Sequence, residues 1–404
     1  MAEVQRFPED FLWGTATAAH QVEGGNSNND WWRWEHSPGH IADGDTSEVA
    51  CDHWHRYKED FALLRRMRNN AHRLSVEWSR VEPSEGQFDA RAIRHYRDVL
   101  GELREQGMAP MVTLLHFTSP LWFAGRGGWA ASGAPEAWLR FVRRAVEELG
   151  DLVALWCTIN EPNIYATQGW MFGDWPPGHH NDIPRLLRVL ANLHNAHEAA
   201  YRLIKELRPE TPVGLAHNRY FLLPARVWNP VDWIAAKTGR GFMDHWPGRR
   251  GLMERTVAAT SDYIGLNHYS GRLMRGMQQV NLSGYPVSDF GDAINPNWMR
   301  EALVDLKRYS KPVYVTESGI ATTDDAWRER FLRDYLSEIW KAIAEDGVDV
   351  RGYFHWTSMD NFEWAHGYRM KFGLIAVDRR TLERTPKPSA KLFGRFAAAN
   401  ALVE

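Results

Sequence analysis

Two glutamates could do acid–base or nucleophilic chemistry, because each ends a run of apolar residues. Glu161 closes the segment ALWCTINEP (154–162), and Glu317 closes PVYVTESG (312–319). Two carboxyl groups flanking one bond are what glycoside hydrolysis requires: one donates a proton, and the other attacks the anomeric carbon or activates water. For either residue alone, a salt bridge at a strand end is the alternative. The presence of both favours the catalytic interpretation.

Other polar and aromatic side chains stand at or just past the ends of further apolar runs. They are His20, Gln21, His116, Asn160, Asn267, Tyr269, Trp356 and Glu363. In a barrel of parallel strands, the carboxyl ends of the strands meet on one face, and active sites lie there. We therefore expect these residues to gather around the two glutamates.

The elements that must position these residues alternate between strand-like and helical patterns. Eight strand-like runs are separated by segments of helical period: FLWGTATA (11–18), RLSVEW (73–78), APMVTLLHF (109–117), ALWCTINEP (154–162), PVGLAHN (212–218), DYIGLNHY (262–269), PVYVTESG (312–319) and VRGYFHWTSMDNF (350–362). This alternation predicts an α/β fold, a (β/α)8 TIM barrel. No Ser/Gly-rich linker interrupts it, so we expect one catalytic domain over residues 1–404.

Helical stripes support the same architecture. Between the third and fourth runs, apolar residues recur at helical spacing: Trp138, Phe141, Val142, Ala145, Val146 and Leu149. Similar stripes run from Ile93 to Leu103 and from Trp327 to Ile343. The Pro- and Gly-rich segment GDWPPGHH (173–180) predicts a loop.

The composition is that of a soluble globular protein, with 44% hydrophobic residues, 25% charged residues and a formal net charge of -3. It favours neither a nucleic-acid nor a membrane partner. The 20 Trp residues suit a binding cleft as well as a core. Cys51 and Cys157 are too few for a disulfide scaffold, which predicts two buried thiols. Without a signal-like N-terminus or a run of 18 apolar residues, we expect a cytoplasmic protein.

Six motifs make the chain resemble the family 1 glycoside hydrolases, the retaining β-glucosidase and β-galactosidase family. The resemblance extends from end to end, and its motifs occur in the family's order: FLWGTATAAHQVEG (11–24), RLSVEWSR (73–80), TINEP (158–162), LNHY (266–269), VTESG (315–319) and HWTSMDNFEWAHGY (355–368). TINEP or VTESG alone is a weak signal, but the six together are specific.

The resemblance implies a role for each reacting group. Glu317 would be the nucleophile that forms a glycosyl-enzyme intermediate, and Glu161 the general acid and base. Asn160 would contact the sugar 2-hydroxyl, while Arg73 and Tyr269 would keep Glu317 ionised. The two glutamates would then titrate far apart.

The resemblance also implies how the substrate is recognised. The residues expected to bind the non-reducing sugar are Gln21, His116, Asn267, Glu363 and Trp364, with Trp356 as a flat floor under the ring. The carboxylate of Glu363 would repel a 6-phosphorylated sugar. We therefore expect an exo-acting β-glycosidase for small-molecule β-glycosides or short oligosaccharides, with no cofactor or metal, which can form a homo-oligomer.

The sequence departs from the family pattern at three places. Ser318 replaces the usual asparagine of the nucleophile motif, and HFTSPLWF (116–123) replaces the commoner HWDLP form. The segments 219–261 and 270–311 are short, from which we predict an open aglycone side and loose leaving-group selectivity.

Two alternatives belong to other functional classes. The motifs CDHWH (51–55) and HNAHE (194–198) place histidines at spacings that metal sites use, so a metal-dependent hydrolase is one of them. Structural hydrogen bonding is the simpler explanation for these histidines. A sugar-binding protein without catalysis is the other, and the presence of both Glu161 and Glu317 argues against it.

Overall fold

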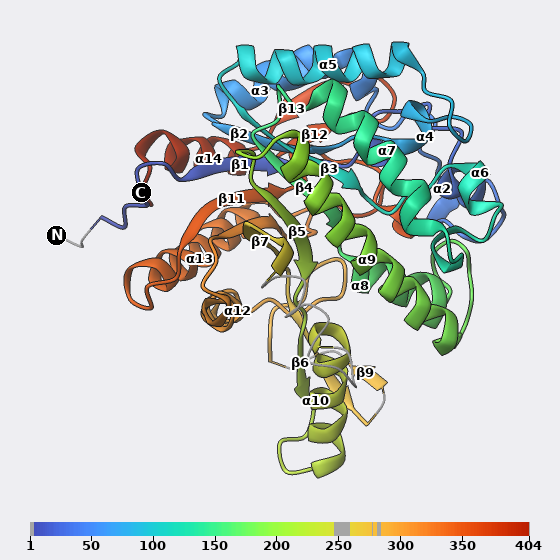
Figure 1. Ribbon diagram of the computed structural model, residues 1–404. Coiled ribbons are helices and arrows are strands. Elements are labelled where there is room, and N and C mark those ends of the chain that lie inside the picture. The colour runs from blue at the N-terminus through green and yellow to red at the C-terminus, as the bar shows by residue number, and fades with distance from the viewer. Residues whose placement is uncertain (1–3, 246–258, 277, 281–283, 404) are drawn as a thin grey trace.

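The computed structural model describes residues 4–245, 259–276, 278–280 and 284–403 (Figure 1). Eight parallel strands form a closed barrel in the order β1-β11-β10-β7-β5-β4-β3-β2. Their bounds are β1 (Leu12–Ala16), β2 (Ala71–Ser75), β3 (Ala109–Leu115), β4 (Leu155–Asn160), β5 (Val213–Asn218), β7 (Tyr263–Asn267), β10 (Val313–Ser318) and β11 (Val350–Trp356). Each lies within or overlaps one of the eight expected runs, so the predicted TIM barrel is confirmed.

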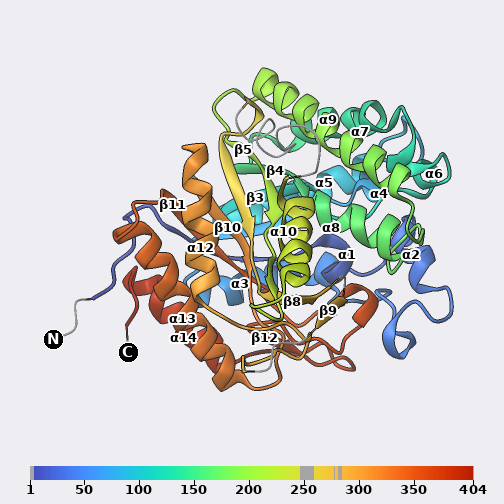
Figure 2. The ribbon, with the colours of Figure 1, turned by 90° about the horizontal axis from the view of Figure 1, so that it is seen from below.

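Long helices surround the strands, as Figure 2 shows with α7 and α9 on one side and α12, α13 and α14 on the other. The helices that alternate with the strands are α3 (His53–Arg66), α5 (Ala90–Glu105), α7 (Ala134–Leu149), α9 (Ile183–Leu207), α12 (Asn297–Leu306), α13 (Asp325–Ala344) and α14 (Pro388–Ala399). Shorter helices lie after strand ends: α1 (Ala19–Val22), α2 (Asp30–Glu35), α4 (Trp78–Val81), α6 (Leu121–Ala124) and α8 (Pro162–Thr167). No helix in the described ranges is both long and apolar enough to cross a membrane.

The predicted apolar stripes face the barrel. All six stripe residues of α7 are buried, from Trp138 to Leu149. In α5, the buried face includes Tyr96 and Leu100, and the Asp89 side chain caps the helix by accepting from the amides of Arg91 and Ala92. Burial of these stripes in one continuous core holds the helices against the strands.

A small sheet and one helix project from the barrel. The sheet contains β6 (Phe221–Pro224), β8 (Gly271–Arg275) and β9 (Gln278–Val280), and α10 (Pro230–His245) packs on β6 and β8 (Figure 1). These elements follow β5 and β7, at the carboxyl ends of barrel strands. The sequence did not predict them, because short strands between barrel units leave a weak pattern. Parts of the two short segments noted above, residues 246–258, 277 and 281–283, lie outside the described residues.

The last expected strand is shorter than predicted. β11 ends at Trp356, and residues 357–362 leave the barrel, where Met359 bridges to Ile375 of β12 (Ile375–Val377). β12 pairs with β13 (Arg384–Pro386) in a separate ribbon. Residues 357–362 are buried although most of them are polar. The Ile375 amide donates to the Ser358 carbonyl and the Asp360 amide donates to the Ile375 carbonyl, each over 2.9 Å, so strand-like pairing continues outside the barrel. The loop at 173–180 and the two buried free thiols are as predicted.

Candidate active site

The structure brings every predicted site residue into one connected cluster at the carboxyl ends of the barrel strands. Each of the following residues contacts at least one other by a hydrogen bond or a ring contact: Gln21, Arg73, His116, Asn160, Glu161, Asn267, Tyr269, Glu317, Trp356, Glu363 and Trp364. The residues come from both halves of the chain, and most of them are buried.

Glu317 lies between a cation and a phenol. The Arg73 guanidinium donates to Oε1 in a buried ion pair, and the Tyr269 hydroxyl donates to Oε2 over 2.7 Å. Burial raises the pKa of the Glu317 carboxyl, while Arg73 and Tyr269 act in the opposite direction. Burial and the neighbouring Glu317 charge also raise the pKa of Tyr269 well above its usual value, so the phenol remains a donor.

Glu161 lies among amides instead. The side chains of Asn218 and Asn267 each donate through Nδ2 to Oε1 of Glu161 over 2.8 Å. Burial, followed by the nearby Glu317 carboxylate, raises the pKa of Glu161 to about 8, against the opposing effect of the two amides. A carboxyl group with this pKa is protonated near neutral pH and can serve as a general acid.

Asparagine side chains connect the two glutamates. Asn160 Oδ1 accepts from Arg73 over 2.7 Å and from Asn267 Nδ2 over 3.1 Å. Asn267 Oδ1 accepts from the Thr316 hydroxyl over 2.7 Å, which orients the Asn267 amide group toward Glu161. The Asn267 donor is thereby oriented by a second hydrogen bond.

A second part of the cluster combines a carboxyl group with flat rings. Gln21 Nε2 donates to Oε2 of Glu363 over 3.2 Å, and Trp356 also hydrogen-bonds to Glu363. Burial and the Glu317 charge raise the pKa of Glu363 to about 8. The ring of His116 stacks on Trp356 with centroids 5.8 Å apart.

Trp364 and His116 complete this part. Their ring centroids are 6.2 Å apart, and Trp364 also stacks on His20 at 5.8 Å. Burial, with the charge of Arg73, lowers the pKa of His116 well below its usual value, so its imidazole is neutral. Asn160 Nδ2 lies 3.3 Å from His116 Nε2. Polar edges and aromatic faces side by side suit a sugar, which presents hydroxyls and C–H faces together.

Sequence reasoning missed Asn218. It ends β5 as Asn160 ends β4 and Asn267 ends β7, and it contacts Glu161 directly. The same position rule that selected the other strand-end residues applies to PVGLAHN, so the signal was present.

The remaining motifs have structural partners. His53 Nδ1 lies 2.7 Å from Asp60 Oδ2, and His197 Nδ1 lies 2.6 Å from the Thr158 hydroxyl. Across the part of the chain that the structure describes, no three or more His, Cys, Asp or Glu side chains form a group that could hold a metal. Ser318 is buried, and its hydroxyl has no hydrogen-bond partner among the described residues.

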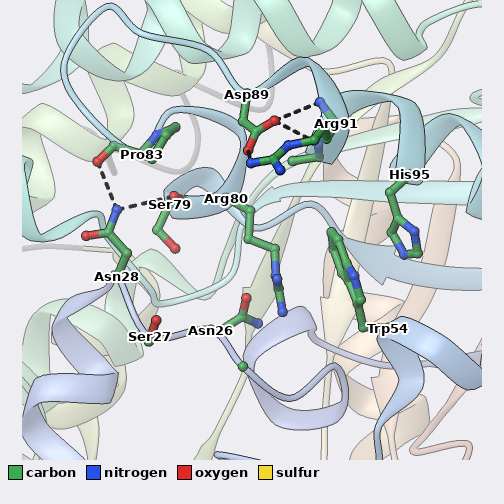
Figure 3. Close-up of a pocket in the computed structure, with 12 residues that line it drawn as sticks. Asn26, Ser27, Asn28, Trp54, Ser79, Arg80, Pro83, Asp89, Arg91 and His95 are labelled. Atoms are coloured by element: carbon green, nitrogen blue, oxygen red, sulfur yellow. Dashed lines mark hydrogen bonds and ion pairs between the residues drawn. The ribbon is translucent and has the colours of Figure 1, made fainter.

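A cavity of about 510 Å³ lies outside this cluster, between the segment after α1 and the helices α4 and α5 (Figure 3). None of the predicted site residues lines it. The Arg80 guanidinium carbon lies over the Trp54 ring, 3.8 Å from its centroid. The His95 ring stacks on the same indole, with centroids 3.7 Å apart. Because the indole already packs between these groups, it does not offer a free platform for a sugar.

Comparison with known proteins agrees with the geometry. The family model of Glycosyl hydrolase family 1 matches residues 3–250 and 252–402. The chain is 32% identical over 433 residues to "Beta-glucosidase A" of Acetivibrio thermocellus, covering 95% of this chain and 96% of that protein.

Two solved structures extend the comparison to three dimensions. "Beta-glycosidase from Pyrococcus horikoshii" is 34% identical with a TM-score of 0.91, over 100% of this chain and 97% of that one. "Beta-glucosidase from Thermotoga maritima in complex with glucoimidazole" is 31% identical with a TM-score of 0.93, over 99% and 100%. With the family model matching nearly the whole chain and the barrel placing two buried glutamates together, this chain is a glycoside hydrolase that belongs to glycosyl hydrolase family 1.

Proposed function

We propose that this chain is a retaining, exo-acting β-glycosidase that hydrolyses terminal non-reducing β-D-glucosyl residues, and that β-galactosides and β-fucosides are further substrates. The observation that carries the proposal is the contrast between the two buried glutamates. Glu317 is bound by a cation and a phenol, and Glu161 is bound by two neutral amides. This contrast suits a nucleophile and a general acid.

In the first step, a carboxylate oxygen of Glu317 attacks the anomeric carbon. The bond from that carbon to the leaving oxygen breaks as Glu161 gives its proton to that oxygen. Arg73 and Tyr269 favour the ionised form of Glu317 before the attack. The products of this step are the free alcohol, a glycosyl ester on Glu317 and the Glu161 carboxylate.

In the second step, water from solvent attacks the anomeric carbon of the ester. The Glu161 carboxylate takes a proton from this water, and the bond to Glu317 breaks. Two inversions at the anomeric carbon return the β configuration. Both glutamates regain their starting protonation states, so no further reactant is needed.

The second part of the cluster serves the sugar. Gln21, His116 and Glu363 supply hydrogen-bonding groups for adjacent hydroxyls, and Trp356 supplies the floor under the ring. Asn160 serves the 2-hydroxyl, where a contact that strengthens in the transition state aids the reaction. The similarity to proteins named as β-glucosidases supports glucose as the sugar.

Two features oppose the binding of 6-phosphorylated sugars: the charge of Glu363 and the apolar surface of Trp364. The pKa of Glu363 is raised to about 8, so charge repulsion alone is weak near neutral pH. Burial of the neighbouring Trp364 adds the cost of placing a phosphate dianion against apolar surface. We expect unphosphorylated glycosides to be the substrates, in a cytoplasmic enzyme built as one catalytic domain with an open aglycone side and able to form a homo-oligomer.

The test of this proposal is to trap the intermediate. A 2-deoxy-2-fluoro-β-glucoside with an activated phenol slows the second step more than the first, so the glycosyl-enzyme intermediate accumulates. We expect intact-protein mass to rise by one fluoroglucosyl group, carried on the peptide that contains Glu317. Glu317→Gln is the control and stays unlabelled. No labelling in an enzyme that hydrolyses aryl glucosides contradicts the double displacement.

A rate panel tests the substrate. We expect kcat/KM to be high for aryl β-glucosides, measurable for β-galactosides and β-fucosides, and at background for the 6-phosphoglucoside. Each rate is measured with and without a chelator. Loss of activity in chelator that zinc restores favours the metal-dependent alternative instead.

A further inference from the structure

The two carboxyl oxygens of Glu161 have different surroundings. Oε1 accepts two N–H donors, one from Asn218 and one from Asn267, each over 2.8 Å. Among the residues that the structure describes, no side chain or backbone group hydrogen-bonds to Oε2. One oxygen is therefore saturated by the protein, and the other is left for a ligand.

An amide nitrogen can donate a hydrogen bond but cannot accept one. In the protonated form of a carboxyl group, the carbonyl oxygen accepts and the hydroxyl oxygen donates. An oxygen that faces two N–H donors is therefore favoured as the carbonyl oxygen. For Glu161, this leaves the proton on Oε2.

We propose that Asn218 is a positioning residue that, together with Asn267, places the transferable proton of Glu161 on Oε2, facing the leaving group. The inference rests on the proposed role of Glu161 as the acid and base. Asn218 itself need not touch the reacting atoms.

Backbone contacts hold Asn218 in a position from which its side chain reaches Glu161. Asn218 lies in register with Asn267 on the neighbouring strand, so the two amides reach Glu161 from the same level of the barrel. The Glu161 amide donates to the Ala216 carbonyl over 2.8 Å, and the Asn163 side chain donates to the Asn218 carbonyl over 3.0 Å. These backbone contacts do not need the Asn218 side chain.

The Asn218 side chain has a single function in this network. Its Oδ1 is buried and has no hydrogen-bond partner within the described ranges. Asn267, by contrast, also contacts Asn160 and Thr316. Removing the Asn218 amide therefore takes one donor from Glu161 and leaves the rest of the cluster connected.

The experiment compares kcat/KM for β-glucosides with good and poor leaving groups. Phenols that leave as stable anions need little proton donation, whereas poor leaving groups depend on it. For Asn218→Ala we expect kcat/KM to fall about 10-fold with phenyl β-glucoside, the value of one hydrogen bond to a carboxyl group. With dinitrophenyl β-glucoside we expect less than about 2-fold, since the proton contributes little there.

A pH profile provides the second readout. Charged or titratable groups around Glu161 are Arg73, Tyr269, Glu317 and Glu363, and none of them is changed by the substitution. Asn218 stabilises the ionised carboxylate, so its loss raises the pKa of Glu161. We expect the basic limb of kcat/KM to move to higher pH. Equal loss for both glucosides, or a basic limb that stays in place, overturns the proposal.

Two conservative variants keep the test informative if Asn218→Ala folds poorly. Asn218→Ser retains a short donor and is expected to recover part of the phenyl glucoside rate. Asn218→Asp keeps the shape but replaces the donor with an acceptor, and is expected to be worse than Asn218→Ala on the phenyl glucoside alone. The reverse order contradicts the assignment. Asn192→Ala, which removes a remote structural amide on α9, is the matched control.

Comparing Glu161→Gln with Asn218→Ala separates the role of Asn218 from the proposed function. If Glu161→Gln shows no dependence on the leaving group, Glu161 is not the acid, and the proposed function falls first. If Glu161→Gln shows the dependence and Asn218→Ala does not, only the role of Asn218 is overturned.

Discussion

The ends of β4 and β10 present the same residue type to one space but surround it differently. At β10, Glu317 receives a guanidinium N–H and a phenol O–H, one on each oxygen. At β4, Glu161 receives two amide N–H groups on a single oxygen. Both side chains are buried, so burial alone does not distinguish them.

The difference shows that neighbouring donors, rather than residue type or depth, divide the work between the two carboxyl groups. A cation favours the ionised form by charge, and a neutral amide favours it only weakly. The region around Glu161 therefore retains a proton that the region around Glu317 tends to lose. Substitutions in either region test this division.

The largest effect is expected from Glu317→Gln. The amide cannot attack the anomeric carbon, so kcat falls on the order of 10⁴-fold or more for every leaving group. Rates with dinitrophenyl and phenyl glucosides provide the measurement. Glu338→Gln, a buried and ion-paired glutamate on α13, is the control and should retain activity. A Glu317→Gln enzyme with unchanged turnover favours the sugar-binding alternative.

Glu161→Gln comes next and is expected to depend on the leaving group. Without the proton, kcat/KM with phenyl β-glucoside falls on the order of 10²- to 10⁴-fold. The dinitrophenyl glucoside loses far less, because its phenolate leaves without help. A small anion such as azide, which needs no general base to attack the intermediate, should raise turnover of the dinitrophenyl glucoside. A uniform loss would assign Glu161 to binding instead.

Arg73→Lys tests the region around Glu317. Arginine reaches Glu317 through one nitrogen and Asn160 through another, and a lysine ammonium cannot reproduce this fork. We expect kcat/KM to fall about 10- to 100-fold, the value of a hydrogen bond between charged groups. The loss should be similar for good and poor leaving groups. A loss confined to poor leaving groups contradicts the division between the two regions.

Tyr269→Phe has a smaller effect that depends on pH. Loss of the phenol donor removes a contact to the ionised carboxylate, so the pKa of Glu317 rises. A larger fraction of Glu317 is then protonated at acidic pH, and the acidic limb of kcat/KM moves to higher pH. We expect a loss of about 10-fold at the old acidic limb. A shift confined to the basic limb would show that Tyr269 acts on Glu161.

The smallest effect is expected from Ser318→Ala. The hydroxyl is buried beside Glu317 and lacks a hydrogen-bond partner in the described structure, so its removal costs no contact. We expect the free energy of unfolding to change by less than about 1 kcal/mol, with either sign, and kcat/KM to stay the same. Denaturant unfolding and a rate measurement provide the check. A large loss of activity means that the hydroxyl serves the substrate.

Much of the fold could be predicted because its pattern is local. Each barrel strand is a short apolar run, and helices such as α7 carry a regular apolar stripe. The arm of β6, β8, β9 and α10 lacked such a signal, since its strands are short and its helix packs on them rather than on the barrel. The continuation beyond Trp356 was misassigned because Met359 bridges to Ile375 of β12, outside the barrel, and the sequence does not mark where pairing with the barrel ends.

The sequence by itself determined which side chains stand at the ends of the barrel strands, and a parallel barrel places such residues on one face whatever their exact contacts. Only the tertiary structure decided which donor meets which oxygen. Asn218 shares Oε1 of Glu161 with Asn267, although the two residues lie 49 positions apart. Hydrogen bonds depend on distances of a few tenths of an ångström between strands, and no single strand contains that information.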